Sequence, residues 1–173
     1  PMLAKKIPAS GEEVPVIGMG SWITFNVGDD PDARAVRVQV LREFFNRGGA
    51  VIDSSPMYGT SEEVIGHCLA QVGASRPLFA ATKVWILGKK SGIRQMEDSR
   101  KLWGVPRFDL MQIHNMLDWE THLVTLKEWK AAGRIRHIGI TTSHGSREGE
   151  MLAAMKRDRF DFVQFSYSFA DRD

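Results

Sequence analysis

Four side chains in this sequence could together deliver a proton to a reacting oxygen: Asp53, Tyr58, Lys83 and His114. A tyrosine hydroxyl has a pKa of about 10, so alone it is a slow acid at neutral pH. A nearby lysine would lower that pKa, and an aspartate could hold the lysine in place. Such an acid, with a histidine to orient the reacting oxygen, suits the reduction of a carbonyl group. The hydride must then come from a cofactor, because no side chain supplies one.

Each of the four residues also has a purely structural interpretation. Asp53 could cap a loop, and Tyr58 beside Gly59 could be an ordinary turn aromatic. Lys83 could be a solvated charge, and His114 could be a core histidine with satisfied hydrogen bonds. Their joint placement, near the ends of three consecutive predicted strands, favours a shared site over coincidence.

Strand-like and helix-like segments alternate along the chain. The opening segment, 2–16, has the pattern of a β-hairpin that turns at Ser10-Gly11. The strands that we predict cover residues 14–19, 50–53, 78–83, 108–114, 135–142 and 160–167. The predicted helices cover residues 31–47, 61–72, 92–103, 119–132 and 147–157, and residues 170–173 are predicted to begin another.

The spacing of the strand ends indicates how these units are arranged. Asp53, Lys83, His114 and Thr142 end successive predicted strands at intervals of about 30 residues, as expected for a parallel sheet. No G-x-G-x-x-G motif follows the first strand, which disfavours an open, doubly wound sheet that binds a dinucleotide. Polar residues at the carboxyl ends of neighbouring strands are typical of a barrel. We therefore predict an α/β fold of the (β/α)8 TIM-barrel type with an N-terminal β-hairpin.

The length bears on how much of such a barrel is present. An eight-unit barrel usually needs roughly 250 residues, whereas this chain has 173 and about six strand–helix units. An open six-stranded edge would leave backbone groups unpaired. We expect a single domain over residues 1–173 that is incomplete at its C-terminal end, after the sixth barrel strand.

Composition and charge exclude several classes of protein. Hydrophobic residues make up 43% of the chain and charged residues 25%, as in ordinary globular domains. The net charge is only +2 and basic residues are scattered, which gives little support to nucleic-acid binding. No apolar run approaches the roughly 20 residues of a membrane helix, and the N-terminus has no apolar signal core. We expect a cytoplasmic protein, or a periplasmic one if a signal peptide has been removed.

Neither the cysteine nor the remaining histidines predict a further site. Cys68 is the single cysteine, which excludes an internal disulfide and a multi-cysteine metal site. Its place in a helical pattern favours a buried small hydrophobe over a reactive thiol. His67, His122 and His137 have no metal-ligand spacing, so we expect no metal.

Six segments, in family order, resemble the aldo-keto reductase superfamily in its bacterial form: VPVIGMGSW, AVIDSSPMYGTSEEVIGHCL, FAATKVW, FDLMQIHN, GRIRHIGIT and FDFVQFSYS. The block D-S-S-x-x-Y-G, which joins Asp53 to Tyr58, is the most specific of them. The resemblance implies a barrel that reduces aldehydes and ketones with NADPH and without a metal. It implies Tyr58 as the proton donor, Lys83 and Asp53 as its tuning pair, and His114 as the residue that orients the substrate.

The same resemblance implies cofactor contacts near the first strands. Gly20, Ser21 and Trp22 would line the nicotinamide side or the substrate pocket, and Asp53 is expected to contact the cofactor as well. Trp85, which follows Lys83, could line the substrate pocket or simply pack.

Further cofactor contacts are implied near the last two strands. Gln164 matches the position that holds the nicotinamide carboxamide. Family members commonly have Ser-Asn where this chain has Thr141-Thr142, and a threonine hydroxyl can still hydrogen-bond the carboxamide. Ser143 and His144 could add to that contact. The family holds the pyrophosphate and the 2′-phosphate from strands seven and eight, so the preference for NADPH over NADH follows from the resemblance alone.

Three functions are compatible with these residues. The first is NADPH-dependent reduction of a small-molecule carbonyl substrate. The second is aldolase or lyase chemistry through a Schiff base on Lys83, which the pairing with Asp53 disfavours. The third is a cofactor-binding regulatory or partner-binding module without significant turnover. Neither the substrate nor the oligomeric state follows from the sequence.

Overall fold

The computed structural model describes residues 2–73, 77–143 and 145–169. Its centre is a sheet of six parallel strands, and neighbours in the sheet are also neighbours in the chain. The strands are β3 (Met19–Gly20), β4 (Val51–Asp53), β5 (Phe79–Val84), β6 (Phe108–Ile113), β7 (Ile135–Thr141) and β8 (Phe162–Gln164). The helices that connect them are α1 (Pro31–Asn46), α2 (Ser61–Val72), α3 (Lys89–Trp103), α4 (Trp119–Ala131) and α5 (Glu148–Arg157). The predicted alternation of strands and helices is confirmed.

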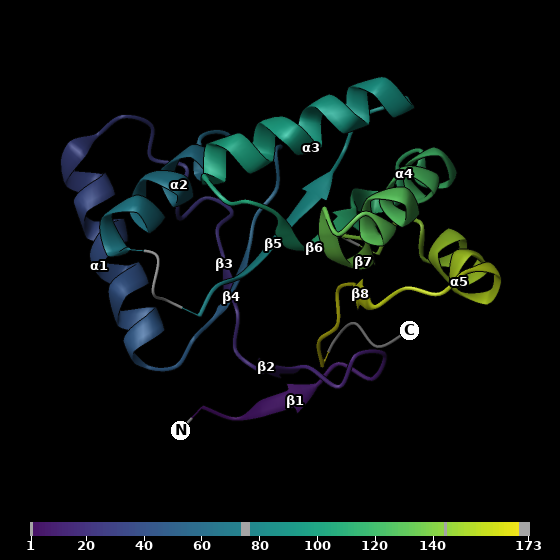
Figure 1. Ribbon diagram of the computed structural model, residues 1–173, viewed down its shortest axis with the longest axis horizontal. Coiled ribbons are helices and arrows are strands. Elements are labelled where there is room, and N and C mark those ends of the chain that lie inside the picture. The colour runs from purple at the N-terminus through teal and green to yellow at the C-terminus, as the bar shows by residue number, and fades with distance from the viewer. Residues whose placement is uncertain (1, 74–76, 144, 170–173) are drawn as a thin grey trace.

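The helices flank the strands, and a separate two-stranded hairpin crosses one end of them (Figure 1). The hairpin consists of β1 (Ala4–Lys6) and β2 (Glu13–Pro15), paired antiparallel as predicted. Gly11, at its turn, has a φ of 72°, which glycine adopts without steric cost. The predicted helix start at residues 170–173 lies outside the described residues. No helix in the described part of the chain combines the length and apolar character needed to cross a membrane.

Strand alternation divides the apolar residues between two cores. In β5, Ala80 and Val84 pack with the helices, whereas Phe79 and Ala81 belong to a second cluster with Ile7 of the hairpin segment. Successive side chains of a strand point to opposite faces, so the second cluster fills the inner face of the sheet. The polar end of β5, at Lys83, lies on that same inner face.

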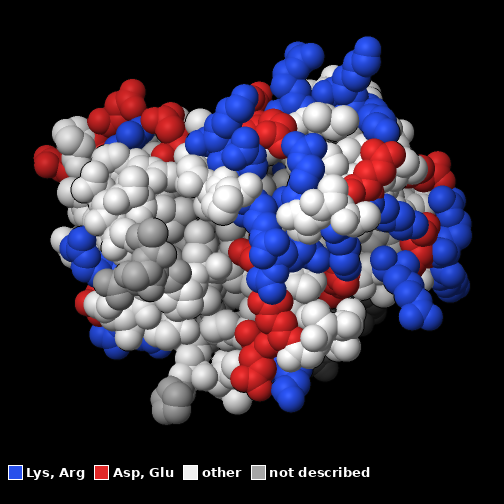
Figure 2. Space-filling model, viewed as in Figure 1, with Lys and Arg blue, Asp and Glu red and all other residues white. Residues whose placement is uncertain are grey.

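Local sequence explains where helices begin and how closely they pack. Asp30 caps α1 by accepting hydrogen bonds from the backbone N–H groups of Asp32 and Ala33, both at 3.0 Å. A Cβ on Gly66 would lie 1.8 Å from the carbonyl oxygen of Leu102, so this glycine allows α2 to approach α3. Lys and Arg side chains lie among Asp and Glu over α3 and α4 (Figure 2), in ion pairs such as Lys89–Glu128.

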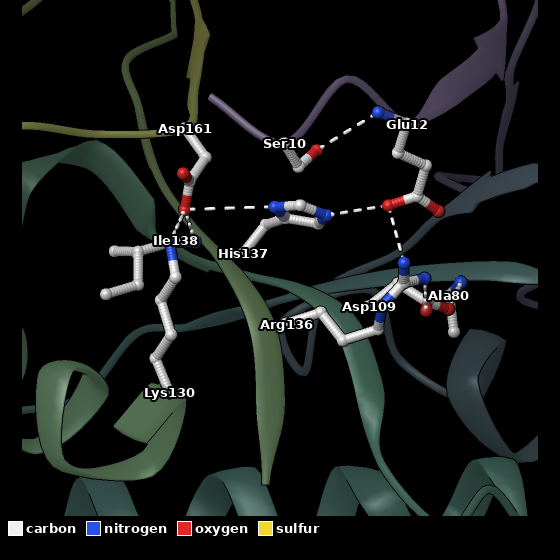
Figure 3. A network of polar contacts seen from close by, with 9 residues as sticks. All are labelled: Ser10, Glu12, Ala80, Asp109, Lys130, Arg136, His137, Ile138 and Asp161. Atoms are coloured by element: carbon white, nitrogen blue, oxygen red, sulfur yellow. Dashed lines mark hydrogen bonds and ion pairs between the residues drawn. The ribbon is translucent and has the colours of Figure 1, made fainter. Parts of the chain in front are cut away.

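The amino end of the sheet carries a set of paired charges, which we call the amino-end network (Figure 3). Arg136 of β7 binds Glu12 of the hairpin at 2.5 Å and Asp109 of β6 at 2.7 Å. His137, buried and packed against Phe79 and Phe162, lies 3.1 Å from the Glu12 carboxylate. The other members, Asp161 and Lys130, form a 2.6 Å pair. The network therefore connects the hairpin to the strands that it crosses.

Three predicted elements differ from the structure by more than one residue. Residues 14–19 are not one strand: β2 ends at Pro15 and β3 begins at Met19, because Val14 pairs in the hairpin whereas Met19 pairs with β4. Helix α3 begins at Lys89 rather than residue 92, directly after Gly88. The last strand is shorter than predicted, since β8 covers only Phe162–Gln164.

Candidate active site

Lys83 and Asp53 form an ion pair at the carboxyl ends of β5 and β4. Lys83 Nζ lies 2.6 Å from Asp53 Oδ2 and donates to the backbone carbonyl of Ser54 at 2.8 Å. Gln112 of β6 donates its Nε2 to the other carboxylate oxygen of Asp53 at 2.8 Å. Lys83 is only 1% exposed. Two acceptors for the ammonium and two donors for the carboxylate offset the cost of removing these charges from water.

Tyr58 lies in the loop after β4, with its ring beside the same lysine. Lys83 Nζ is 5.3 Å from the ring centre. Burial, and then the negative charge of Asp53, raise the pKa of Tyr58 to about 12. The predicted lowering of this pKa was wrong, because Asp53 counters the lysine charge and burial disfavours the phenolate. Within the described residues, no group hydrogen-bonds the Tyr58 hydroxyl.

His114 directly follows β6 and begins a short 3-10 helix, η1 (His114–Met116). Its Nδ1 lies 2.7 Å from Thr141 Oγ1 at the end of β7. The same threonine oxygen accepts the backbone N–H of Asn115 at 3.3 Å. Burial, and then the charge of Lys83, lower the pKa of His114 to about 4. The imidazole is therefore neutral at pH 7.

Three of the four predicted catalytic residues line one cleft of about 210 Å³, and the fourth, Asp53, reaches it through Lys83. The lining residues are Tyr58, Lys83, His114, Thr141, Thr142, Ser143, Gln164, Phe165 and Ser166. A larger hollow of about 390 Å³ lies between α2 and α3 and contains none of the four. The cleft is therefore where a substrate could meet these groups.

The residues predicted to bind cofactor at β7 and β8 reach this cleft, but with different bonding. The Thr141 hydroxyl is occupied by His114. The Thr142 hydroxyl is buried and has no hydrogen-bond partner among the described residues. Gln164 has an exposed side chain, and its backbone carbonyl accepts the Thr142 N–H at 2.9 Å. Ser143 donates to Asn115 at 2.9 Å, and His144 lies outside the described residues.

The residues predicted to bind cofactor near β3 are not brought together in the same way. Gly20 is exposed at the end of β3 and in register with Asp53, and Trp22 is 62% exposed. Ser21, in contrast, is fully buried, and its hydroxyl donates to Ser54 Oγ at 2.7 Å. The Ser21 side chain therefore supports the loop that follows β4 instead of facing the cleft.

Sequence reasoning missed one residue at the centre of the site. Gln112 is 2% exposed and holds Asp53 from the neighbouring strand β6. The signal was present, because a glutamine within the apolar run of β6 lies two residues before His114 and thus on the same face. Cys68 is fully buried and burial raises the pKa of its thiol to about 11, as expected for a small core residue.

The family of this protein, with its parallel sheet and its site at one edge, follows from comparison with known families. The model of the Aldo/keto reductase family matches residues 16–173, and the chain belongs to this family. The methylglyoxal reductase YeaE of Escherichia coli is 29% identical over 147 residues, which is 81% of this chain and 50% of YeaE. The aldo-keto reductase YhdN of Bacillus subtilis is 27% identical over 154 residues, or 78% of this chain and 45% of YhdN. The chain thus spans about half the length of these relatives.

Solved structures of the family have the same fold. The thermostable aldo-keto reductase Tm1743, solved with the inhibitor epalrestat, is 28% identical and superposes with a TM-score of 0.78 over 96% of this chain and 63% of its own. An aldo/keto reductase of Brucella melitensis, 23% identical, has a TM-score of 0.79 over 100% of this chain and 66% of its own. The prediction of a (β/α)8-type architecture, of which this chain forms six strands, is confirmed.

Proposed function

We propose that the protein reduces aldehydes or ketones to alcohols with NADPH, and that Tyr58 donates the proton. The observation that carries the proposal is the unpartnered Tyr58 hydroxyl in a cleft shared with Lys83 and His114. Tyr58 is half-buried and its hydroxyl is not among the buried atoms that lack a partner, so this hydroxyl is open to a ligand in the cleft. Membership of the family supports the same reaction.

Tyr58 is protonated at neutral pH, because its pKa is raised to about 12. The donor form is therefore fully populated where the protein works. A weak acid can still protonate the carbonyl oxygen as it becomes an alkoxide, because an alkoxide is far more basic than a phenolate. Lys83, beside the ring, stabilises the phenolate that remains, and Asp53 and Gln112 hold the lysine and its counter-charge in place.

His114 orients the carbonyl oxygen in this proposal. Thr141 Oγ1 accepts the Asn115 N–H, which leaves its own hydroxyl proton free to donate to His114 Nδ1. That arrangement places the ring proton on Nε2, where it can hydrogen-bond the substrate oxygen. The neutral ring polarises the carbonyl without competing with Tyr58 as an acid.

The cofactor would supply the hydride that adds to the carbonyl carbon. Thr142 and Gln164 would hold its nicotinamide carboxamide: the buried Thr142 hydroxyl lacks a partner and the Gln164 side chain is exposed at the cleft. A carboxamide offers both a donor and an acceptor, so it can satisfy both groups.

The aldolase alternative receives less support. Lys83 Nζ directs its hydrogen bonds to Asp53 and to the Ser54 carbonyl, and it is nearly inaccessible. A Schiff base needs a free amine that can reach a carbonyl carbon.

The test is Tyr58→Phe in the natural protein over its whole length, with NADPH and benzaldehyde or methylglyoxal. We expect kcat to fall about a thousandfold, in the range that general acids contribute, with NADPH affinity within about twofold of wild type. Tyr167, the other tyrosine of this chain and 72% exposed, provides the control variant Tyr167→Phe. Equal turnover in Tyr58→Phe and wild type contradicts the proposal. NADPH binding without turnover in the wild type favours a binding module instead.

A further inference from the structure

The loop that carries Tyr58 makes a turn directly after the tyrosine, against a side chain of the neighbouring loop. Gly59 has a φ of 60°, which glycine adopts without steric cost. A Cβ on Gly59 would lie 2.4 Å from Asn26 Oδ1, so a larger residue here would displace the asparagine. Asn26 belongs to the loop after β3, which pairs with β4 in the sheet. The backbone beside Tyr58 therefore lies directly against Asn26.

Asn26 also hydrogen-bonds the residue that follows this glycine. Its Oδ1 accepts the backbone N–H and the hydroxyl of Thr60, both at 3.0 Å. The Thr60 hydroxyl oxygen in turn accepts the Gly28 N–H at 2.9 Å. We call Asn26 and Thr60 the loop clamp, because these three hydrogen bonds join the loop after β3 to the loop after β4.

Thr60 does not cap the helix that it precedes. It is the N-cap residue of α2, a position where a threonine oxygen usually accepts an N–H group of the first helical turn. Its hydroxyl makes no such bond and is directed to Asn26 and Gly28 instead. Loss of a capping bond lowers the stability of a helix, so the stability of α2 does not explain this arrangement.

The loop that provides Asn26 is fixed to the body of the protein on both sides of this residue. Phe25 is 2% exposed and packs in the main core. Arg34 of α1 donates to the Gly28 carbonyl at 2.7 Å and binds Glu63 of α2 at 2.6 Å. Asn26 itself is exposed. Its replacement should therefore change the loop clamp without unfolding the core.

The position of Tyr58 depends on the loop that the clamp holds. No group in the described part of the chain hydrogen-bonds the Tyr58 hydroxyl, and Lys83 Nζ lies 5.3 Å from the ring centre. The Tyr58 carbonyl accepts the N–H of Ser61, the residue after Thr60, at 3.1 Å. Movement of Thr60 would therefore move the tyrosine. A displacement of about 1 Å at a reacting group can lower a rate by up to about a hundredfold.

We infer that Asn26 is a positioning residue that holds the proton donor Tyr58 at the cleft. The inference rests on the proposed function, because it requires Tyr58 to act on a substrate. Asn26 does not line the cleft, so it acts through Gly59 and Thr60. Its replacement should therefore lower kcat and leave the affinity for NADPH unchanged.

The first test is Asn26→Leu in the natural protein over its whole length, with NADPH and methylglyoxal. Leucine has a similar size but cannot accept the two hydrogen bonds from Thr60, so kcat should fall about tenfold. The dissociation constant for NADPH should stay within about twofold of wild type. Asn26→Asp keeps an oxygen acceptor at the same place and should restore kcat to within about threefold of wild type.

Thr24→Val is the matched control for this test. Thr24 lies in the same loop, and its hydroxyl bonds the Gly20 carbonyl at 3.5 Å instead of the Tyr58 loop. This variant should keep kcat within about twofold of wild type. The inference is overturned by an unchanged kcat in Asn26→Leu, by a matching loss of NADPH affinity, by no recovery in Asn26→Asp, or by an equal loss in Thr24→Val.

The second test needs no turnover. In protein labelled with 3-fluorotyrosine, the fluorine resonance of position 58 is identified by its loss in Tyr58→Phe. This resonance should shift in Asn26→Leu and return toward its wild-type position in Asn26→Asp, because the ring moves relative to Lys83 in the first variant only. An unmoved resonance in Asn26→Leu overturns the inference. A wild-type protein that gives these shifts but consumes no NADPH contradicts the proposed function alone.

Discussion

Both ends of the sheet carry paired charges, but the two ends differ in how completely their polar groups are bonded. In the amino-end network, each acidic and basic side chain has a partner of opposite charge, and His137 lies within hydrogen-bond distance of Glu12 (Figure 3). At the carboxyl end, the Lys83–Asp53 pair is satisfied in the same way. Around that pair, however, the Tyr58 hydroxyl, His114 Nε2 and the Thr142 hydroxyl have no partner in the described part of the chain.

The difference indicates that the paired charges at the amino end have a structural role, whereas those at the carboxyl end belong to a binding or reactive site. A saturated network fixes the hairpin and leaves no capacity for a ligand. Of the unpaired groups beside the ion pair, the Thr142 hydroxyl is buried and costs stability, whereas the Tyr58 hydroxyl and His114 Nε2 are accessible and can bond a ligand. Substitutions at the amino end should therefore change stability, whereas substitutions at the carboxyl end should change turnover or binding.

The largest expected difference in kcat/KM comes from substituting methionine for a lysine at each end of the sheet. Lys83→Met removes the cation beside Tyr58 and should lower kcat/KM about a hundredfold to a thousandfold, measured by NADPH consumption. Lys130→Met removes the lysine of the amino-end network and should leave kcat/KM within about twofold. Comparable losses in the two variants would show that the ends do not differ in the way proposed.

The depressed pKa of His114 predicts a loss of stability in acid. The pKa is about 4 in the folded chain and near 6.5 in the unfolded chain, so the unfolded state binds a proton first as the pH falls. Stability that is present above pH 6.5 is lost between pH 6.5 and 4, by about 3 kcal/mol at about 1.4 kcal/mol per pH unit. Urea unfolding at both pH values measures the loss. His114→Asn should remove most of this pH dependence, and an identical slope in the variant would refute the assignment.

Much of this site was predictable from the sequence because strand ends recur at regular intervals. Asp53, Lys83 and His114 were placed at neighbouring strand ends from spacing alone, since parallel strands bring their carboxyl ends to one edge. The pKa of Tyr58 was not predictable in this way. It depends on burial and on the balance between Lys83 and Asp53, which only the three-dimensional arrangement fixes.

The hydrogen-bond partners of individual side chains were also not predictable from the sequence. Thr141 and Thr142 are adjacent and identical, and both were predicted to contact cofactor. The Thr141 hydroxyl bonds His114, whereas the Thr142 hydroxyl is buried without a partner among the described residues, and the sequence gives no sign of this difference. Ser21 was misplaced for a similar reason, as its hydroxyl is directed at Ser54.

At the amino end, Asp161→Ala should cost about 2 kcal/mol of unfolding free energy. Asp161 is half-buried and accepts both the Ile138 N–H at 2.8 Å and the Lys130 ammonium at 2.6 Å, so its removal leaves the N–H of the buried Ile138 unpaired. Asp158→Ala, which breaks ion pairs with the exposed side chains of Lys127 and Arg157, is the control and should cost less than about 1 kcal/mol. If kcat falls in Asp161→Ala while the variant remains folded, the amino end affects turnover and the proposed difference between the two ends is wrong.

The smallest expected effect is that of Thr142→Val. It is also the most specific, because the substitution should increase stability but weaken NADPH binding. Thr142→Val keeps the side-chain shape and removes a buried hydroxyl without a partner, so it should stabilise the fold by up to about 1 kcal/mol. The same change should weaken NADPH binding by about three- to tenfold, measured by fluorescence titration, since one hydrogen bond is lost. Thr125 on α4 also has a buried hydroxyl with no partner in the described part of the chain, but it does not line the cleft. Thr125→Val should therefore stabilise the fold equally and leave NADPH affinity unchanged. A difference in NADPH affinity between the two variants is expected only if the Thr142 hydroxyl bonds the cofactor.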